Sequence, residues 1–162
     1  MSPAPLPAPV LDHAGLTCTD LAASLGFYQH LLGLPLLDRG EGPGRAAGIA
    51  GARVAYAYLD AGHGQVIELL EYRHPRATAP GSCALPVVTP GAVHVALRVA
   101  DLGRLLERLR HAGIRPLTAG PVVAGAGAGH PNGARLVYVL DPDQHVIELV
   151  QLVTQPEIPC EK

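Results

Sequence analysis

The 162-residue chain lacks the marks of several protein classes. It has three cysteines, an odd number with no Cys-x-x-Cys pair. This argues against a disulfide framework or a zinc knuckle and favours a reducing compartment, so we expect a cytoplasmic protein. The formal net charge is −2 with no basic cluster, which argues against nucleic acid as a partner. No apolar run approaches the roughly 20 residues that span a bilayer, and the start does not resemble a signal peptide, so we expect no membrane partner.

What the chain does have is an apolar composition and an internal repeat. Hydrophobic residues make up 48% and charged residues 16% of the sequence, which suits a globular core. The repeat is visible in three pairs of residues that lie 80 or 81 positions apart: His13 with His94, Asp20 with Asp101, and Glu68 with Glu148. Such self-similarity predicts two copies of one structural unit.

Each copy reads as a strand, an amphipathic helix and two or three further strands. Asp20 and Asp101 are predicted N-caps of the two helices, and Gly33 and Gly113 are predicted to end them. The glycine-rich stretch 119–133 is predicted to be irregular, either a flap over a site or an ordinary surface loop. The predicted division of the chain is a tail (1–10), a first module (11–72), a linker (73–90), a second module (91–153) and a second tail (154–162).

Each module also places a glutamate inside an apolar strand. Glu68 follows Val66-Ile67 and Glu148 follows Val146-Ile147. A carboxylate buried without a partner is costly, so each should be exposed, protonated, paired or bound to a metal.

The histidines make the metal the favoured choice. His13 and His94 occupy equivalent first-strand positions, and a pseudo-twofold relation between modules would bring both histidines and both glutamates together. Two imidazole nitrogens and two carboxylate oxygens suit one divalent metal ion per site, such as Zn, Ni, Co, Mn or Fe. Exposed carboxylates without a metal remain the open alternative.

The arrangement resembles the vicinal oxygen chelate superfamily, which includes glyoxalase I, methylmalonyl-CoA epimerase, extradiol dioxygenases, fosfomycin-resistance enzymes and bleomycin-binding proteins. The resemblance covers about residues 10–153 and is carried by four motifs: LDHAGLTCTDL, VIELLEY, AVHVALRVADL and YVLDPDQHVIELVQ. It implies an α+β fold of two tandem βαβββ modules that form a barrel-like cleft. It also implies that the metal ligands are His13, Glu68, His94 and Glu148.

The resemblance implies an enzyme, most similar in its four ligands to glyoxalase I. We expect a metal-dependent isomerase or lyase that moves a proton next to a carbonyl of a small metal-chelated substrate, with Glu148 or Glu68 as the base. Thr17 and Tyr72 replace the arginine and asparagine that typically hold glutathione in that enzyme, which argues against glutathione.

The remaining site residues are expected to bind substrate. Val66, Leu70 and Tyr72 share strand faces with the ligands and are expected to line a partly apolar pocket. Arg98 either anchors an anion in the same cleft or lies at its rim. Tyr138 corresponds to a tyrosine of extradiol dioxygenases. The first alternative function is an Fe(II) ring-cleaving dioxygenase, since that group holds iron with two histidines and one glutamate. A non-catalytic antibiotic-binding or resistance protein is the second. A homodimer is expected, with the cleft formed either within one chain or across two.

Overall fold

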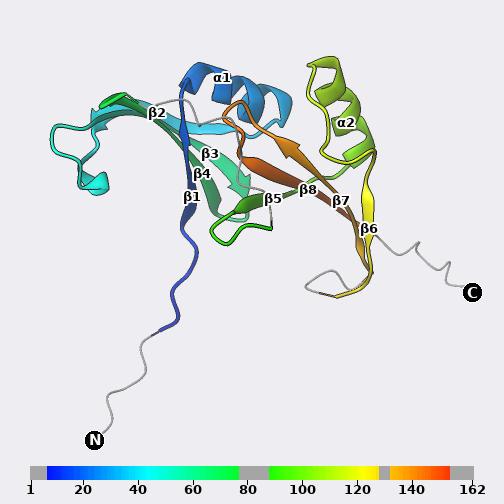
Figure 1. Cartoon of the computed structure of the whole chain (residues 1–162). Helices are drawn as coiled ribbons and strands as arrows, with labels where there is room; N and C mark the ends of the chain where they lie inside the picture. Colours follow the sequence, from blue (N-terminus) through cyan, green and yellow to red (C-terminus); the bar gives the residue numbers. More distant parts are fainter. Residues whose placement is uncertain (1–6, 77–87, 128–131, 154–162) are drawn as a thin grey trace, which may run out of the picture.

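The computed structural model describes residues 7–76, 88–127 and 132–153, drawn in colour in Figure 1. The first repeat contains β1 (His13–Cys18), α1 (Leu21–Leu25), η1 (Gly26–Leu31), β2 (Leu36–Pro43), η2 (Arg45–Ala47), β3 (Arg53–Gly62) and β4 (Gln65–His74). The second contains β5 (His94–Arg98), α2 (Leu102–His111), β6 (Val122–Ala124), β7 (Ala134–Leu140) and β8 (Val146–Leu152). No helix in these ranges is long and apolar enough to cross a membrane.

The strands form two four-stranded sheets with the same topology. Their orders are β1-β4-β3-β2 and β5-β8-β7-β6. In each sheet the first strand pairs parallel with the last, and the other pairs are antiparallel. The register repeats as well, because His13 lies opposite Val66 and His94 lies opposite Val146. The predicted pair of βαβββ modules is therefore confirmed, although the described strands remain two separate sheets and do not close into a barrel.

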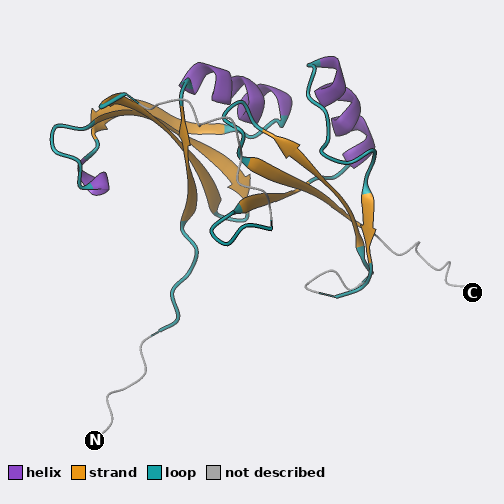
Figure 2. Ribbon diagram, in the orientation of Figure 1, coloured by secondary structure: helices purple, strands orange, loops and turns teal. Residues whose placement is uncertain are grey.

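Both helices lie on the same side of the sheets, as Figure 2 shows. Their N-caps are as predicted: Asp20 accepts hydrogen bonds from two helix amides, and Asp101 accepts one from the amide of Arg104. Gly33 and Gly113 follow the helices with positive φ angles of 85° and 81°, a conformation that glycine adopts without strain. The first helix widens after Leu25 into the π-helix η1, in which Tyr28 is fully buried.

One hydrophobic core runs through both modules beneath the helices. Its fully buried members include Leu59 and Leu69 from the first sheet and Ile147 and Leu149 from the second. On β4 the side chains alternate, so Ile67 and Leu69 enter the core. Glu68 faces the opposite side. Each glutamate therefore lies on the helix-free face of its sheet, beside Val66 and Leu70 in the first module and beside the buried Val146 and Val150 in the second.

A polar contact also joins the two modules. Asp141, whose side chain is 1% exposed, accepts a 2.8 Å hydrogen bond from the Tyr28 hydroxyl. Asp143 accepts bonds of 3.0 Å and 2.6 Å from the amide and hydroxyl of Thr19. The Asp-Pro-Asp turn between β7 and β8, predicted from the sequence only as a turn, therefore fastens the second module to the first helix.

Two strands correct the sequence-based interpretation. Strand β6 lies inside the stretch 119–133, which was predicted to be irregular, and β2 has no apolar alternation from Asp38 to Gly42. Both lie at sheet edges and are held by pairing with β7 and β3 rather than by burial of their own side chains. Most of the predicted linker, residues 77–87, lies outside the described residues, as do residues 128–131 of the glycine-rich stretch.

Candidate metal centre

The first module brings a histidine, a glutamate and a tyrosine together. We call His13, Glu68 and Tyr58 the first half-site. His13 Nε2 lies 3.2 Å from Glu68 Oε2, and the Tyr58 hydroxyl donates a 2.8 Å hydrogen bond to Glu68 Oε1. The other ring nitrogen of His13, Nδ1, lies 2.8 Å from Asp12 Oδ2. One imidazole nitrogen is thus oriented by Asp12 while the other faces Glu68.

The second module repeats the set with His94, Glu148 and Tyr138, the second half-site. His94 Nε2 lies 2.9 Å from Glu148 Oε2. The Tyr138 ring meets the His94 ring edge-on, with the ring centroids 5.5 Å apart. The two glutamate side chains are 14% and 13% exposed, whereas both histidines are exposed. Each carboxylate is therefore largely shielded from water, whereas the histidine beside it is exposed to solvent.

The charges of these groups act on one another. The hydrogen bond to Asp12, with the charge of Glu68 adding to it, raises the pKa of His13 despite partial desolvation. The hydrogen bond to Glu68 raises the pKa of Tyr58, and burial, followed by the charge of Glu148, raises the pKa of Tyr138. Both tyrosines therefore keep their hydroxyl proton at physiological pH, and that of Tyr58 is donated to Glu68.

The parallel pairing of first and last strands explains why the residues meet. In this register Gly15 lies opposite Glu68 and Ala96 lies opposite Glu148. A Cβ atom at Gly15 would lie 3.5 Å from Glu68 Oε2, so a small residue keeps space open beside the carboxylate. Each histidine is two residues before this small residue, and side chains two apart on a strand share a face.

Each half-site has the donor geometry of two ligands of one cation. Nitrogen and oxygen ligands at about 2.0–2.2 Å from a transition metal, at tetrahedral or right angles, are roughly 2.9–3.5 Å apart. The two Nε2–Oε2 separations, 3.2 Å and 2.9 Å, match such an edge. Asp12 supplies the outer partner that a ligating histidine usually has on its second nitrogen. The residues therefore fit a divalent metal ion.

One chain does not gather the predicted four ligands. Within the described ranges no three His, Cys, Asp or Glu side chains are close enough together to hold a metal ion. The sequence predicted a group of four, and a single chain instead presents two pairs. The four-ligand site stays a prediction that one chain alone does not fulfil.

The predicted substrate-binding residues fall into two groups. Val66 and Arg98 both line a pocket of about 420 Å³ where the start of β4 approaches β5. Arg98, for which the sequence left cleft or rim open, therefore faces a cavity between the modules. Leu70 and Tyr72 follow Glu68 on the same face of β4, as predicted, with Tyr72 packing toward Gly44 at the far end of the sheet.

Sequence reasoning missed Tyr58 and Asp12. Tyr58 lies 80 residues before Tyr138 and ten before Glu68, so the repeat offset that aligned the glutamates would have found it. Asp12 has no such signal, because its counterpart in the second module is Val93.

A model of the Glyoxalase/Bleomycin resistance protein/Dioxygenase superfamily matches residues 10–149. The chain belongs to this superfamily. An uncharacterized protein of Bacillus subtilis, YwkD, is 26% identical over 145 residues, covering 87% of this chain and 95% of that protein. A glyoxalase family protein from Bacillus cereus is similar in structure, with a TM-score of 0.76, 20% identity, and coverage of 94% and 100% of the two chains.

Another protein of similar structure is an enzyme. It is the trypanothione-dependent glyoxalase I of Leishmania major, with a TM-score of 0.59, 19% identity, and coverage of 89% of this chain and 87% of that one. At this identity the likeness shows the fold alone. The superfamily includes enzymes such as glyoxalase I and commonly binds a divalent metal ion, in agreement with the donors of the half-sites.

Proposed function

We propose that the protein is a metal-dependent isomerase or lyase resembling glyoxalase I, which moves a proton next to a carbonyl of a small metal-chelated substrate. The observation that carries this proposal is the repetition of a His–Glu pair with its tyrosine at equivalent positions of two modules. If the histidine and glutamate met only by chance on the surface, there would be no reason for the same three residue types to recur at equivalent strand positions of both modules.

The metal ion would be held by His13, Glu68, His94 and Glu148. A bound divalent ion supplies a Lewis acid that lowers the cost of negative charge on a substrate oxygen. The chain's own residues do the rest. Glu148 or Glu68 would accept the proton next to the substrate carbonyl. In the first half-site Tyr58 holds one carboxylate oxygen, Oε1, so Glu68 keeps a fixed orientation.

The four ligands are proposed to come from two chains, because one chain separates them into two pairs. The chain segments that lead into the two histidines support this. Val10 is 89% and Val93 is 80% exposed, and Leu11 is exposed as well. Apolar side chains beside each half-site favour burial by a second copy. A homodimer in which the first half-site of one chain faces the second half-site of its partner would complete two sites by symmetry.

The substrate is proposed to be a small oxygenated molecule, with Arg98 as the anchor of an anionic group and Val66 and Leu70 as apolar wall. Thr17 and Tyr72 stand where glutathione-binding residues are expected, which favours a substrate without glutathione.

The tyrosines also bear on the dioxygenase alternative. Tyr138 is one point of similarity to the dioxygenases, but Tyr58 stands beside Glu68 in the other half-site and donates to it. A tyrosine that accompanies both glutamates fits a support for the carboxylates, so it does not favour ring cleavage over isomerisation.

The test begins with elemental analysis of protein purified without added metal. We expect close to one metal ion per pair of half-sites, and loss of that metal in His94→Ala. The matched control is His111→Ala, at the exposed end of α2. Stoichiometric metal in His94→Ala would contradict the proposal, as would metal-free protein that does not take up any of the five metals.

Activity is tested separately. Metal-loaded protein should exchange the proton next to the carbonyl of one member of a panel of 2-oxoaldehydes and 2-hydroxyketones with deuterated water, followed by NMR. Glu148→Gln should reduce this exchange at least about 100-fold. Oxygen consumption with catechols, in place of proton exchange, would favour the dioxygenase. Metal binding without either reaction would favour a binding protein.

A further inference from the structure

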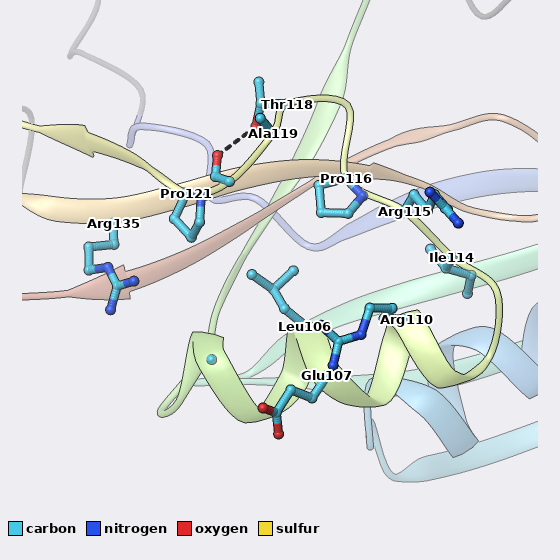
Figure 3. A pocket seen from close by; sticks show the side chains of 12 residues that line it. Leu106, Glu107, Arg110, Ile114, Arg115, Pro116, Thr118, Ala119, Pro121 and Arg135 are labelled. Atoms are coloured by element: carbon cyan, nitrogen blue, oxygen red, sulfur yellow. Dashed lines mark hydrogen bonds between the residues drawn. The ribbon is translucent and has the colours of Figure 1, made fainter.

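A second cavity lies on the helix side of the second module, away from the half-sites. It has a volume of about 620 Å³ and lies between α2 and the segment from Ile114 to Pro121, with Arg135 of β7 at one end (Figure 3). Arg135 has the same strand parity as Val137 and Val139, which are buried in the core, whereas Tyr138 has the opposite parity. The cavity and the second half-site are therefore on opposite faces of the sheet.

The cavity is cationic although the protein is not. Arg110, Arg115 and Arg135 line it, and among the described residues Glu107 is the one acidic member of its lining. None of the three arginines forms an ion pair with a described residue. The lining thus carries a formal charge of +2 (three arginines less one glutamate) on a chain whose net charge is −2. Three arginines from three segments, the helix α2, the loop after it and β7, line one cavity, and this surplus of positive charge favours an anionic ligand.

The rest of the lining is largely apolar, and hydrogen bonds fix the segment that forms its outer wall. Leu106 of α2 lies between the arginines in Figure 3, and Ile114, Pro116 and Pro121 complete the wall. The outer segment is fixed to β7, because the Leu117 amide donates a 2.9 Å hydrogen bond to the Tyr138 carbonyl. The Thr118 hydroxyl donates a 2.8 Å bond to the Gly120 carbonyl, shown dashed in Figure 3. An apolar pocket with a few convergent charges is the usual form of a small-molecule site.

The repeat provides an internal control for the arginines. At the helix offset of 81, Arg110 corresponds to Gln29, and at the strand offset of 80, Arg135 corresponds to Ala55. Where the second module has Ile114-Arg115-Pro116, the first has Leu34-Pro35. The βαβββ fold of the first module therefore forms without these charges, so the fold itself does not require them in the second.

We propose that this cavity binds a small organic anion, in which one or two carboxylate or phosphate groups are joined to an apolar body. The arginines receive the acidic groups, and Leu106, Ile114 and the prolines cover the apolar part. The inference does not depend on the metal centre, because no residue is shared between them.

The test is an NMR titration of the uniformly ¹⁵N-labelled full chain with 4-phenylbutyrate and with phenyl phosphate. At least one should shift the amide signals of Gly103, Thr118 and Gly120 saturably, with a Kd below about 1 mM. Comparing the Kd values of the two anions shows whether the cavity prefers a carboxylate or a phosphate. Neutral 4-phenylbutanol and inorganic phosphate should bind at least about tenfold more weakly, because each lacks half of the recognition. Absence of saturable shifts at these amides up to about 5 mM of both anions would overturn the proposal.

The double variant Arg110→Gln/Arg135→Ala installs the first module's residues and should weaken anion binding at least about tenfold. The matched control, Arg104→Gln, removes a charge from α2 outside the cavity and should change the Kd less than twofold. Equal affinity in the double variant, or an equal loss in the control, would contradict the assignment. Wild-type protein gives an independent check, since raising the salt from about 50 to about 300 mM should weaken binding severalfold. Affinity unchanged by salt would likewise count against the arginines.

Discussion

The two half-sites have the same strand pairing and register, but different residues contact the two histidines. His13 has Asp12 on its second nitrogen, 2.8 Å away, and Glu68 has the Tyr58 hydroxyl. In the second half-site Val93 stands at the position of Asp12, and Tyr138 packs edge-on against His94. Both keep a Nε2–Oε2 contact and a small residue opposite the glutamate.

The comparison shows that the positions of the donor atoms and the residues behind them are determined separately. The repeated register between first and last strands fixes where the donor atoms lie, so both modules retain the pair. The residues behind the donors are free to differ, and they determine how strongly each donor is oriented and charged. The same holds elsewhere: at the start of each helix the amide of the first residue is bonded by Glu71 in one module and by Gln151 in the other.

The largest effect is expected where the modules are joined. Tyr28 corresponds to Leu109 in the second module, so only the first helix sends a hydroxyl into the other module's turn. Tyr28→Phe leaves the buried Asp141 short of one donor and should lower the free energy of unfolding by about 2 kcal/mol. Urea denaturation measures this, with Tyr56→Phe as the control. A change below about 0.5 kcal/mol would show that the hydrogen bond between Tyr28 and Asp141 does not stabilise the fold.

The next prediction concerns the histidine supports. Asp12→Asn removes the charge behind His13 and should weaken metal affinity about tenfold, measured by competition with a chelating dye. Val93→Ile alters the equivalent position beside His94, where no charge is lost and the apolar surface is kept, and should leave affinity within about twofold. If the two variants behaved alike, the proposed difference between the half-sites would be wrong.

A smaller effect is expected at the helix starts. Glu71→Gln makes the first module resemble the second, keeps an oxygen for the Leu21 amide, and loses the 2.7 Å ion pair with Arg73. It should cost about 0.5–1 kcal/mol in urea denaturation, since Arg73 is half-exposed. The reverse change, Gln151→Glu, keeps the Leu102 bond and should be nearly neutral. A cost well above about 2 kcal/mol for Glu71→Gln would mean that the charge itself is required.

The smallest effect concerns pH. The hydrogen bond to Asp141 raises the pKa of His145 above 6.5, so folding favours the protonated ring. Its stabilisation is full below about pH 6.5 and is lost as the pH rises through the raised value. His145→Gln, which installs the equivalent Gln65 of the first module, should therefore destabilise the protein on the order of 0.5 kcal/mol at about pH 5.5. By about pH 9 the difference should largely disappear. A difference that grows with pH would have the wrong sign.

The sequence predicted those parts of the molecule that repeat. Asp20 and Asp101 identified both helix starts, and the alternation around Glu68 and Glu148 predicted which way the glutamates face. The edge strands β2 and β6 were not predicted, because their side chains show no periodic pattern. Each is held in place by hydrogen bonds to a neighbouring strand. Contacts between modules, such as Tyr28 with Asp141, depend on how two units pack and leave no local pattern.

The candidate site divides in the same way. Each His–Glu pair follows from strand register, which the repeat reveals. The separation of the two pairs within one chain follows from the packing of the modules, which local patterns do not encode. The arginine-lined cavity was missed for a related reason, because Arg135 on β7 comes to the same cavity as Arg110 and Arg115 only when the second module has folded.

The central claim is that the two half-sites, contributed by different chains, hold one metal ion. It is tested most directly by mixing two inactive variants, His13→Ala/Glu68→Gln and His94→Ala/Glu148→Gln, under conditions that exchange subunits. Each variant alone should bind no metal at the site. If sites form between chains, half of the dimers in an equal mixture contain one chain of each variant. Each of these regains one of its two sites, so about a quarter of wild-type metal content and activity should return. A mixture that stays as empty as its components, although exchange is shown by mass-tagged subunits, would contradict the account.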